Sequence, residues 1–429
     1  MLYKLPVVVL AALFVCSSAV AQSPWSAGYR LELRADYRWS DDERHPVPFP
    51  PGAAMQTPDP GHHVELNVAD LQLDTGYGEM FAARVKVHFQ AKHRRNPTST
   101  DRLIDADELF VRFGRHPQFL ERPEKTSFFV QAGKFPKMER QPVRLLESYG
   151  LAATSFNRFE DVQVLTGGTI GRNFYWRVQA ANGNPLFFRD PNALAGDNGT
   201  EQELRGEVKD FGTGFPILYN AETEDLFFNT EHVQWGEAIG YRWQRDDQTA
   251  GFDAILFHYS REMSDREELT GTAYGGDLDL LVVEPAEVGG AIARPVGLPL
   301  DGRNKTEYGA RVYAEWHAAT FIGQFTQQEI AGNERHGWEL EAGYRIPLDL
   351  GPIESIQPAV RASSLRNDFG NAPGFPARSI LWNWDKVDAG VRVDLERGLD
   401  VTVEYTQHQV ESLFPLELRE ALVTVRWRG

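Results

Sequence analysis

One run of sixteen residues near the N-terminus limits the fold of this chain more than any other feature. It reads WSAGYRLELRADYRWS from Trp25 to Ser40, with apolar or aromatic residues at odd positions and small or polar residues at even positions. Only a β-strand sorts such a run onto two faces. At ~3.3 Å per residue this strand is about 50 Å long. Aromatic residues lie toward both of its ends, which predicts a strand that crosses a membrane between two water interfaces.

Residues 1–21 predict a cleaved signal peptide. An early Lys4 precedes the apolar run 5–15, and small residues end the segment at 19–21. Cys16, the only cysteine in the chain, lies inside this segment, so the mature chain is expected to have no thiol and no disulfide. Beyond it, no apolar run approaches the ~20 residues of a membrane-spanning helix. A secreted chain of this kind either stays soluble or inserts as a β-barrel.

Further alternating runs follow along the whole mature chain, and all together give about sixteen strands. An even number of strands is the rule in single-chain bacterial barrels. The expected strands are 25–40, 62–74, 80–92, 103–114, 126–135, 160–170, 173–184, 230–244, 250–261, 305–317, 319–330, 335–347, 355–365, 380–395, 399–410 and 416–428.

The connections between these strands alternate in length. Long ones fall on one side, at 41–61, 93–102, 136–159, 185–229, 262–304, 331–334, 366–379 and 411–415, whereas the opposite side has mostly short turns, with 115–125 the longest. Bacterial barrels show the same asymmetry between outer loops and periplasmic turns. The second strand changes phase at 69–70, which predicts a β-bulge. Residues 22–429 are therefore expected to form one all-β domain, a transmembrane antiparallel β-barrel.

The face opposite lipid carries acidic and basic residues in nearly equal number. A hydrated, charged wall is typical of a water-filled pore, because a dry interior would not tolerate it. The alternative for each residue is a structural salt-bridge ladder. The basic residues predicted to line the pore are Arg30, Arg34, Arg38, Arg84, Lys86, Arg112, Arg177, Arg242 and Arg345.

The third outer connection, 136–159, is too apolar for a loop exposed to water. We expect it to fold into the barrel and to narrow the lumen, with a short helix that caps the rim as the alternative. The narrowing would have a basic bias. The residues predicted at this constriction are Lys134, Lys137, Arg140, Arg144 and Arg158.

The signal peptide, the opening strand, the sixteen-strand pattern and the GKF segment 133–135 together resemble Gram-negative outer-membrane porins. The likeness is greatest to the porin O and P type, which passes phosphate and related anions. In that family the segment after GKF folds inward and arginines line the path. The resemblance therefore implies a role in the constriction for Lys134, Lys137, Arg140 and Arg144.

This chain departs from the family in two respects. It ends on Arg428 and Gly429 after Trp427, whereas the family's barrel usually ends on an aromatic residue. Its predicted lumen is also balanced in charge, so phosphate selectivity is not expected to carry over.

Composition and motifs limit the partners and the chemistry. A formal net charge of −17 argues against a nucleic-acid partner. The chain has no GxSxG, HExxH, Walker or CxxC pattern, so we expect no enzyme activity, no cofactor and no metal site. Basic residues at 92–95 are expected to meet lipopolysaccharide at the outer rim. The acidic loops 185–229 and 262–304 are expected to be solvated, with divalent cations bridging to lipopolysaccharide as the alternative.

The sequence therefore predicts a porin in the outer membrane of a Gram-negative bacterium. It would pass small hydrophilic solutes or anions by passive diffusion, with pore width and wall charge setting the selectivity. Both a monomer and a homotrimer are open. An export channel for an acidic polysaccharide, of the alginate type, is the main alternative, and a wider, uniformly positive lumen would favour it. An outer-membrane enzyme would need a Ser, His and acid cluster at the rim, and a soluble β protein would have shorter strands.

Overall fold

The structure, a computed structural model, describes residues 24–41, 44–46, 54–56, 61–89, 104–117, 119–121, 126–141, 143–156, 160–183, 218–220, 232–262, 269–271, 281–282, 294–295, 304–330, 332–368, 383–411 and 415–429. The expected signal peptide 1–21, the basic segment 92–95 and Arg158 lie outside these residues. So does most of the two acidic loops.

One sheet forms the wall of the molecule. Its strands are β1 (Trp25–Ser40), β4 (Gly61–Tyr77), β5 (Phe81–Phe89), β6 (Ile104–Gly114), β7 (Phe128–Pro136), β8 (Glu160–Ile170), β9 (Phe174–Ala181), β11 (Gln234–Gln244), β12 (Ala250–Glu262), β16 (Asn304–Trp316), β17 (Ala319–Ile330), β18 (Asn333–Tyr344), β19 (Ile346–Leu350), β20 (Ile353–Asp368), β21 (Asn383–Leu395), β22 (Leu399–Glu411) and β23 (Leu416–Arg428).

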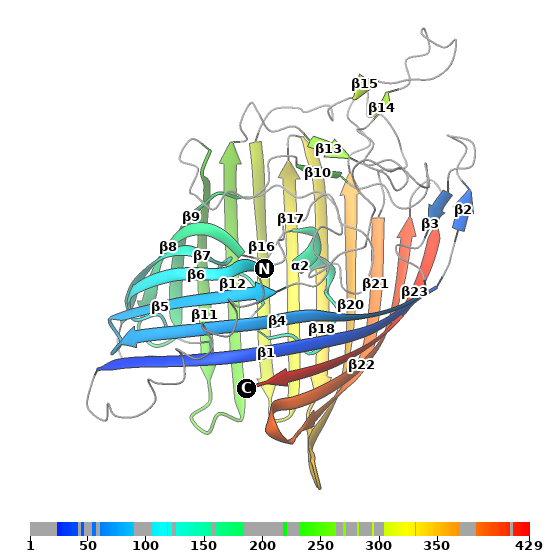
Figure 1. Cartoon of the computed structure of the whole chain (residues 1–429). Coiled ribbons are helices and arrows are strands. Elements are labelled where there is room, and N and C mark those ends of the chain that lie inside the picture. The colour runs from blue at the N-terminus through cyan, green and yellow to red at the C-terminus, as the bar shows by residue number, and fades with distance from the viewer. Residues whose placement is uncertain are drawn as a thin grey trace, which may run out of the picture.

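These strands close into an antiparallel barrel (Figure 1). β18 and β19 both pair with β20 and form one membrane-crossing strand interrupted at Arg345, so the barrel has 16 strands, as predicted. The ring closes where β1 pairs with β4 on one side and β23 on the other. Leu31 and Gly429 exchange two backbone hydrogen bonds of 2.9 and 3.0 Å at this seam.

Other short elements lie in the connections. Three ribbons belong to long connections on the outer side: β2 (Arg44–Pro46) with β3 (Ala54–Gln56), β10 (Leu218–Asn220) with β13 (Leu269–Gly271), and β14 (Leu281–Val282) with β15 (Arg294–Pro295). A short helix, α2 (Leu151–Ser155), and a 3-10 turn, η3 (Glu396–Gly398), complete the described elements. Among the described residues no helix is long and apolar enough to cross a membrane.

The predicted bulge in β4 lies slightly earlier than expected. Arg34 pairs with Val68 whereas Ala35 pairs with Leu66, so Asn67 is the extra residue. This buried amide donates a hydrogen bond to Asp36 from within the barrel. The bulge therefore turns the side chain of Val68 away from lipid. A bulge at 69–70, as predicted, would have left Val68 facing lipid with Leu66.

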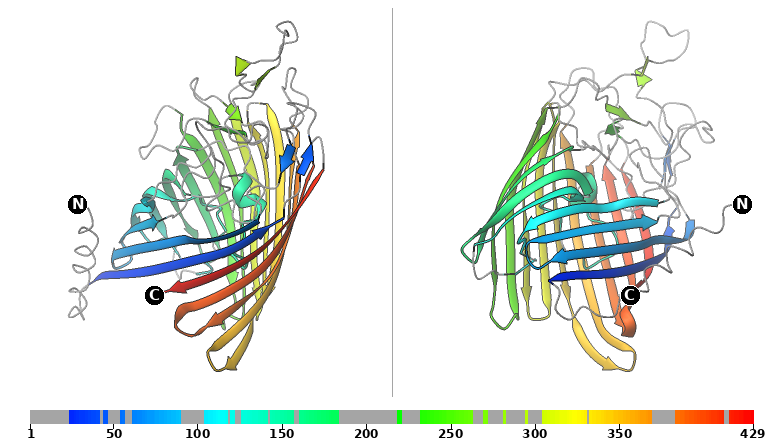
Figure 2. Two further views of the ribbon diagram at one scale, coloured as in Figure 1. Left: turned by 45° about the vertical axis from the view of Figure 1, so that its right-hand side comes forward. Right: turned by 60° about the vertical axis from the view of Figure 1, so that its left-hand side comes forward.

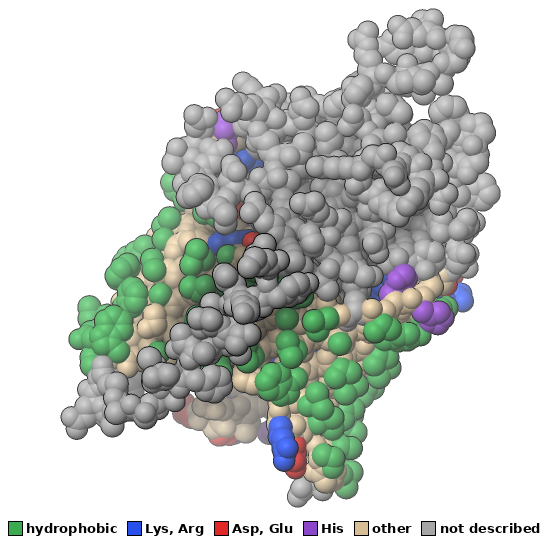
Figure 3. Space-filling model, viewed as in Figure 1, with side chains coloured by type: hydrophobic (Ala, Val, Ile, Leu, Met, Phe, Trp, Pro, Cys, Tyr) green, Lys and Arg blue, Asp and Glu red, His purple; other side chains and the backbone are tan. Residues whose placement is uncertain are grey.

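Alternate side chains form an apolar belt on the outside of the wall, and Figure 3 shows hydrophobic side chains over the strands on the visible face. At the periplasmic strand ends the belt becomes aromatic. The rings of Trp25 and Tyr77 lie 5.1 Å apart, and those of Phe81 and Phe113 lie 5.4 Å apart. Aromatic girdles of this kind mark the membrane interface in transmembrane barrels. Further exposed members at this end are Phe128, Phe174, Trp316, Tyr344 and Trp427.

Candidate functional site

The connection between β7 and β8, residues 137–159, is here called loop 3, and its described residues are 137–141 and 143–156. Figures 1 and 2 show α2, which belongs to this loop, within the ring of strands. Several loop 3 side chains are fully buried although they belong to no strand, among them Leu146 and Leu151. The loop therefore enters the lumen, and α2 lies inside the barrel rather than capping its rim.

Carboxylates on the far wall accept hydrogen bonds from the backbone of loop 3. The N–H groups of Leu145 and Leu146 donate to Glu341 of β18 over 2.7 and 3.2 Å. The N–H of Ser148 donates to Glu404 of β22 over 3.1 Å. An irregular loop inside a barrel would otherwise leave buried N–H groups without partners. Wall carboxylates thus take the place of water and fix the path of the loop.

The apolar side chains of loop 3 fit against glycines of the wall. A Cβ atom at Gly343 of β18 would lie 2.9 Å from Leu145, and one at Gly390 of β21 would lie 2.9 Å from Leu146. At a distance below 3.0 Å, a side chain at either position would force the leucine to move. The wall is therefore recessed where the loop packs.

Glu147 of loop 3 is surrounded by four arginines. Its carboxylate lies 2.6 Å from Arg392 and 2.7 Å from Arg426, and 3.5 and 3.6 Å from Arg144 and Arg34. Burial alone would raise the pKa of this carboxyl group, but the surrounding guanidinium groups outweigh burial and lower the pKa from 4.5 to about 2. Glu147 is therefore ionised throughout the physiological range and ties loop 3 to three strands.

Arg361 of β20 reinforces the same attachment. Its guanidinium donates to the carbonyl oxygen and hydroxyl of Ser148 over 3.0 and 2.7 Å, and to Asp388 over 2.9 Å. All three side chains are buried. A charge is retained in such a site only when it is paired and hydrogen-bonded, and here both conditions hold.

A second segment enters the lumen from the periplasmic side. The connection between β6 and β7, whose described residues 115–117 and 119–121 we call the inner segment, was expected to be a simple turn. Instead the ring of Phe119 lies 4.8 Å from that of Tyr313 in β16, and Leu120 packs in one cluster with Leu145 and Leu146 of loop 3. Loop 3 and the inner segment therefore meet inside the barrel.

His116 begins this inward turn. Its ring lies 4.2 Å from that of Phe129. Burial first, and then the positive charges of Arg177, Arg112 and Arg242, hold the pKa of His116 well below its usual value. The imidazole is therefore neutral at physiological pH and adds no charge to its surroundings.

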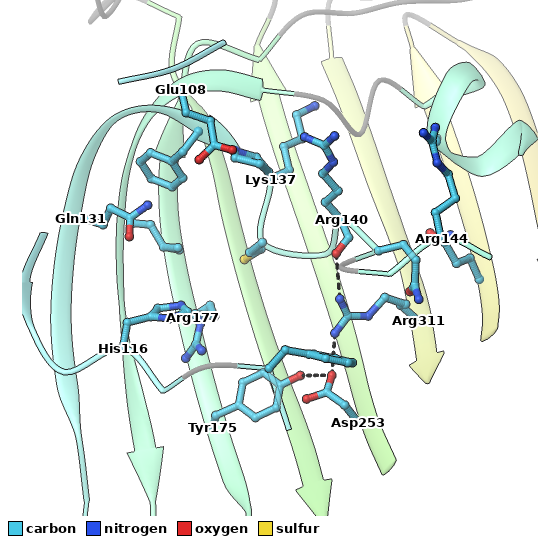
Figure 4. A pocket seen from close by; sticks show the side chains of 18 of the residues that line it. Glu108, His116, Gln131, Lys137, Arg140, Arg144, Tyr175, Arg177, Asp253 and Arg311 are labelled. Atoms are coloured by element: carbon cyan, nitrogen blue, oxygen red, sulfur yellow. Dashed lines mark hydrogen bonds and ion pairs between the residues drawn. The ribbon is translucent and has the colours of Figure 1, made fainter. Parts of the chain in front are cut away.

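A cavity of about 610 Å³ lies between loop 3, the inner segment and the near wall (Figure 4). Its lining is basic. The charged side chains that line it are Arg84, Lys137, Arg140, Arg144, Arg177, Arg242, Arg311 and Arg361 on the basic side and Glu108, Asp253, Glu339 and Glu341 on the acidic side.

Three arginines lie in the lower part of this cavity, and two of them share one carboxylate. Asp253 lies 2.5 Å from Arg311 and 3.7 Å from Arg242, and it accepts a hydrogen bond of 3.0 Å from the hydroxyl of Tyr175. Arg177 has no carboxylate partner among the described residues and donates instead to the carbonyl of the preceding residue over 2.9 Å. Near Asp253 the lining therefore brings three arginines against one carboxylate, whereas other cavity arginines have partners of their own, such as Glu160 for Arg140.

Only some of the residues predicted at the constriction line the cavity. Lys137, Arg140 and Arg144 of loop 3 line the cavity. Lys134 does not, and Arg158 lies outside the described residues. Lys134 has the same strand phase as the lipid-facing Phe128, and its ammonium lies 3.7 Å from Asp105. Strand alternation thus directs Lys134 away from the lumen, whereas the family resemblance implied that it lies at the constriction.

Three of the nine predicted lining residues lie on the cavity itself, namely Arg84, Arg177 and Arg242. Arg84 is paired with Asp74 over 2.7 Å and with Glu108 over 3.2 Å. Its charge is therefore compensated, whereas that of Arg177 is not.

Three others are buried or half-buried in ion pairs inside the barrel. Arg38 lies 3.1 Å from Glu420, and Lys86 lies 2.9 Å from Asp70. Arg34 belongs to the cluster around the loop 3 carboxylate described above. The side chains of these three residues are thus engaged in salt bridges inside the barrel, which was the alternative to a role in lining the pore.

The remaining three are Arg112, Arg30 and Arg345. Arg112 lies on β6, and its buried Nε atom has no hydrogen-bond partner in the part of the chain that the structure describes. Arg30 is exposed toward the periplasmic end of β1. Arg345 is also exposed and pairs with Asp394 over 3.0 Å. The last two thus lie near the periplasmic end of the wall, away from the cavity.

One group of carboxylates could in principle share a cation. Asp107, Glu108 and Glu160 bring one oxygen each within 4.8 Å of one another. Lys86 pairs with Asp107, and Arg140 pairs with Glu160. Protein cations therefore already neutralise this cluster, and we assign it a structural role.

Sequence reasoning missed the inner segment and the two cavity arginines Arg311 and Arg361 as site residues. A signal for the inner segment was present, because Phe119 and Leu120 are large apolar residues in an otherwise polar turn. Alternation is consistent with a lumen-facing position for both arginines, but it does not reveal which lumen residues a folded loop will approach.

Comparisons with known proteins identify the fold. No family model matches the chain, and no curated protein matches its sequence. The outer membrane channel DcaP of Acinetobacter baumannii has a TM-score of 0.55 and 9% identity, over 94% of this chain and 97% of that chain. OprB of Pseudomonas putida has a TM-score of 0.51 and 9% identity, over 96% and 100%. A loop-deletion mutant of OmpT, an outer membrane protein of Vibrio cholerae, has a TM-score of 0.51 and 9% identity, over 95% and 100%. This chain therefore has the transmembrane barrel fold of Gram-negative outer-membrane proteins.

Proposed function

We propose that the protein is an outer-membrane channel through which small hydrophilic solutes diffuse passively, with a preference for anions. The observation that carries this proposal is the cavity lining, in which eight Lys or Arg side chains accompany four Asp or Glu side chains. A pore selects by its width and by the charge on its wall. An excess of fixed positive charge attracts anions and repels cations at close range.

Loop 3 supplies part of that charge. Lys137, Arg140 and Arg144 project from the loop into the cavity, so the loop would set both the width and the sign of the passage. The DcaP and OprB neighbours support a channel by their fold. Phosphate selectivity of the porin O and P type is not part of this proposal, because acidic groups also line the lumen.

Zero-current potentials in planar bilayers test the proposal. The refolded mature protein, placed in a gradient of potassium chloride, should give a potential of the sign set by chloride. The triple variant K137Q/R140Q/R144Q should move that potential toward zero, and K137Q alone should do so partially, while the control R345Q should not. A potential set by potassium in the unmodified protein would overturn the anion preference.

An export channel for acidic polysaccharide would share the basic lining. Leu120 of the inner segment packs with Leu145 and Leu146 of loop 3 inside the barrel, and a lumen narrowed at this contact would suit small solutes better than a polymer chain. We also propose that the protein contacts lipopolysaccharide and assembles as a homotrimer. Chemical cross-linking of the protein in native outer membranes would reveal a trimer, and a monomer band alone would exclude it.

A further inference from the structure

The lower part of the cavity offers a cationic centre for an anionic group. Arg177 is only 5% exposed, and its described hydrogen bonds go to the backbone carbonyls of Trp176 (2.9 Å) and Gly168 (3.5 Å). Its neighbours Arg242 and Arg311 share Asp253. A buried guanidinium group without a counter-charge is unfavourable, so a solute that brings a carboxylate to this point would be stabilised.

Other parts of the same cavity lining are apolar and aromatic, and Phe119 lies beside the cationic centre, with the guanidinium carbon of Arg311 5.8 Å from its ring centroid. Phe110 of β6, Phe119 of the inner segment, Met138 of loop 3 and Leu165 of β8 contribute to the lining. Phe110 and Phe119 are only partly buried, so their rings present surface to the cavity. A strongly hydrated inorganic ion gains nothing from such surface, whereas a solute with an apolar body removes its own apolar area from water there.

The size of the cavity agrees with a small organic molecule. Its volume of about 610 Å³ is within the ~300–1,000 Å³ of ordinary ligand pockets. Such pockets usually combine apolar walls with a few placed polar groups that fix the orientation of the ligand. Here Arg177 and Phe119, from a strand and from the inner segment, provide the two kinds of contact.

We propose that this cavity binds organic anions that carry a carboxylate on a flat, apolar body. The carboxylate lies against Arg177, with Arg242 and Arg311 beside it, and the body packs on Phe110 and Phe119. The site is one step of the diffusion path, so this inference rests on the proposed channel function. It adds a substrate class that charge alone does not specify, because charge alone would treat acetate and benzoate alike.

Single-channel recording with two carboxylates tests the proposal. Benzoate or acetate is added to the refolded protein in a planar bilayer, and interruptions of the chloride current are counted as the concentration rises. Benzoate should interrupt the current at concentrations about tenfold lower than acetate, which corresponds to a difference of ~1.4 kcal/mol in binding. R177Q should weaken the block by both anions.

Aromatic variants separate the two contacts. F119A should weaken the block by benzoate more than the block by acetate and so remove most of the advantage of benzoate, and F110A should do the same to a smaller extent. F128A is the matched control, because Phe128 lies on the lipid-facing side and is 58% exposed. Each variant is first checked for the heat-dependent gel mobility of a folded barrel, and F110A still tests the site if F119A does not fold.

Two outcomes distinguish the failures. Equal block by benzoate and acetate in a channel that prefers chloride would overturn the aromatic site and leave the proposed function intact. A channel without any chloride preference would overturn the proposed function itself. If benzoate still blocks both F119A and F110A at about tenfold lower concentrations than acetate, the apolar body does not pack on these two rings.

Discussion

Two parts of the barrel wall carry similar charged residues and use them differently. The docking wall, formed by β18, β20 to β23 and β1, holds loop 3, and its arginines pair with carboxylates. Arg392 and Arg426 contact Glu147 of the loop, and Arg361 contacts Asp388 and the loop backbone. The cavity wall, formed by β6 to β9, β11, β12 and β16, has Arg177, outside any described ion pair, and arginines that share one aspartate.

This difference separates a structural from a functional use of the same residue type. On the docking wall Arg392, Arg426 and Arg361 hold a buried loop and have little charge left to offer a solute. On the cavity wall the three arginines near Asp253 outnumber the one carboxylate between them, so a passing anion can interact with their charge. Of these two sets of wall arginines, only the second should influence ion selectivity, together with Lys137, Arg140 and Arg144 of loop 3.

Removal of the central carboxylate of the docking wall should have the largest effect. E147A leaves four arginines without their common partner, and loss of one member of a buried ion cluster costs about 3–5 kcal/mol. We expect a large drop in the denaturant midpoint of the barrel in lipid vesicles and a noisier, larger conductance as loop 3 detaches. E396A, an exposed carboxylate in η3, is the control. Unchanged conductance in E147A would contradict the docking role.

Acid should weaken the same attachment in a defined pH window. Because the pKa of Glu147 is lowered from 4.5 to about 2 in the folded state, its contribution to stability is full above about pH 4.5 and is lost as the pH falls toward 2. The difference in melting temperature between the unmodified protein and E147Q should therefore be constant from pH 7 to about 5 and then narrow. Thermal unfolding followed by circular dichroism measures this difference. If this difference in melting temperature already narrows near pH 7, the arginines do not lower the pKa of the Glu147 carboxyl group.

Steric filling of the recessed wall should have a smaller effect. G390V places a side chain where Leu146 of loop 3 now packs, and overpacking of this kind costs about 1–3 kcal/mol. We expect reduced stability and increased conductance without a change in ion preference. The matched control is G323V, since a Cβ at Gly323 meets no atom closer than 3.4 Å. A shift in the zero-current potential of G390V would show that the docking wall also contributes to selectivity.

The smallest effect is expected for Lys134. It does not line the cavity, and its charge is opposed by Asp105 at 3.7 Å. K134Q should change stability by less than about 0.5 kcal/mol, as is usual for partly exposed substitutions, and should leave the zero-current potential unchanged. If K134Q loses as much chloride preference as K137Q, Lys134 contributes to the constriction and the prediction is wrong.

The sequence predicted the barrel well because the signal is local. Period-2 alternation depends only on neighbouring residues, and in β1 it correctly separates lipid-facing Tyr29 from lumen-facing Arg34. The same holds for the number of strands and for the sides on which most long and short connections fall. The excess of apolar residues in loop 3 predicts that the loop packs against other parts of the barrel, and Leu145 and Leu146 do contact the wall and the inner segment.

The site was predicted less completely because it depends on contacts across the lumen. Alternation gives Arg34 and Arg177 the same orientation, but it does not show that only Arg34 lies near Glu147 of loop 3. Those partners are far apart in the sequence and meet only when the loop is docked. Phe119 was missed for the same reason, because its partner Tyr313 lies on β16, far away in the sequence, and the two rings meet only in the folded barrel.

Zero-current potentials of one variant from each wall test the central claim most directly. R177Q removes a charge from the cavity wall, and R426Q removes a charge from the docking wall that is paired with Glu147 and Asp400. In a gradient of potassium chloride we predict that R177Q moves the potential of the channel toward zero and that R426Q leaves it unchanged. Equal shifts in the two variants, or a shift in R426Q alone, would contradict the division of the wall into a docking part and a selective part.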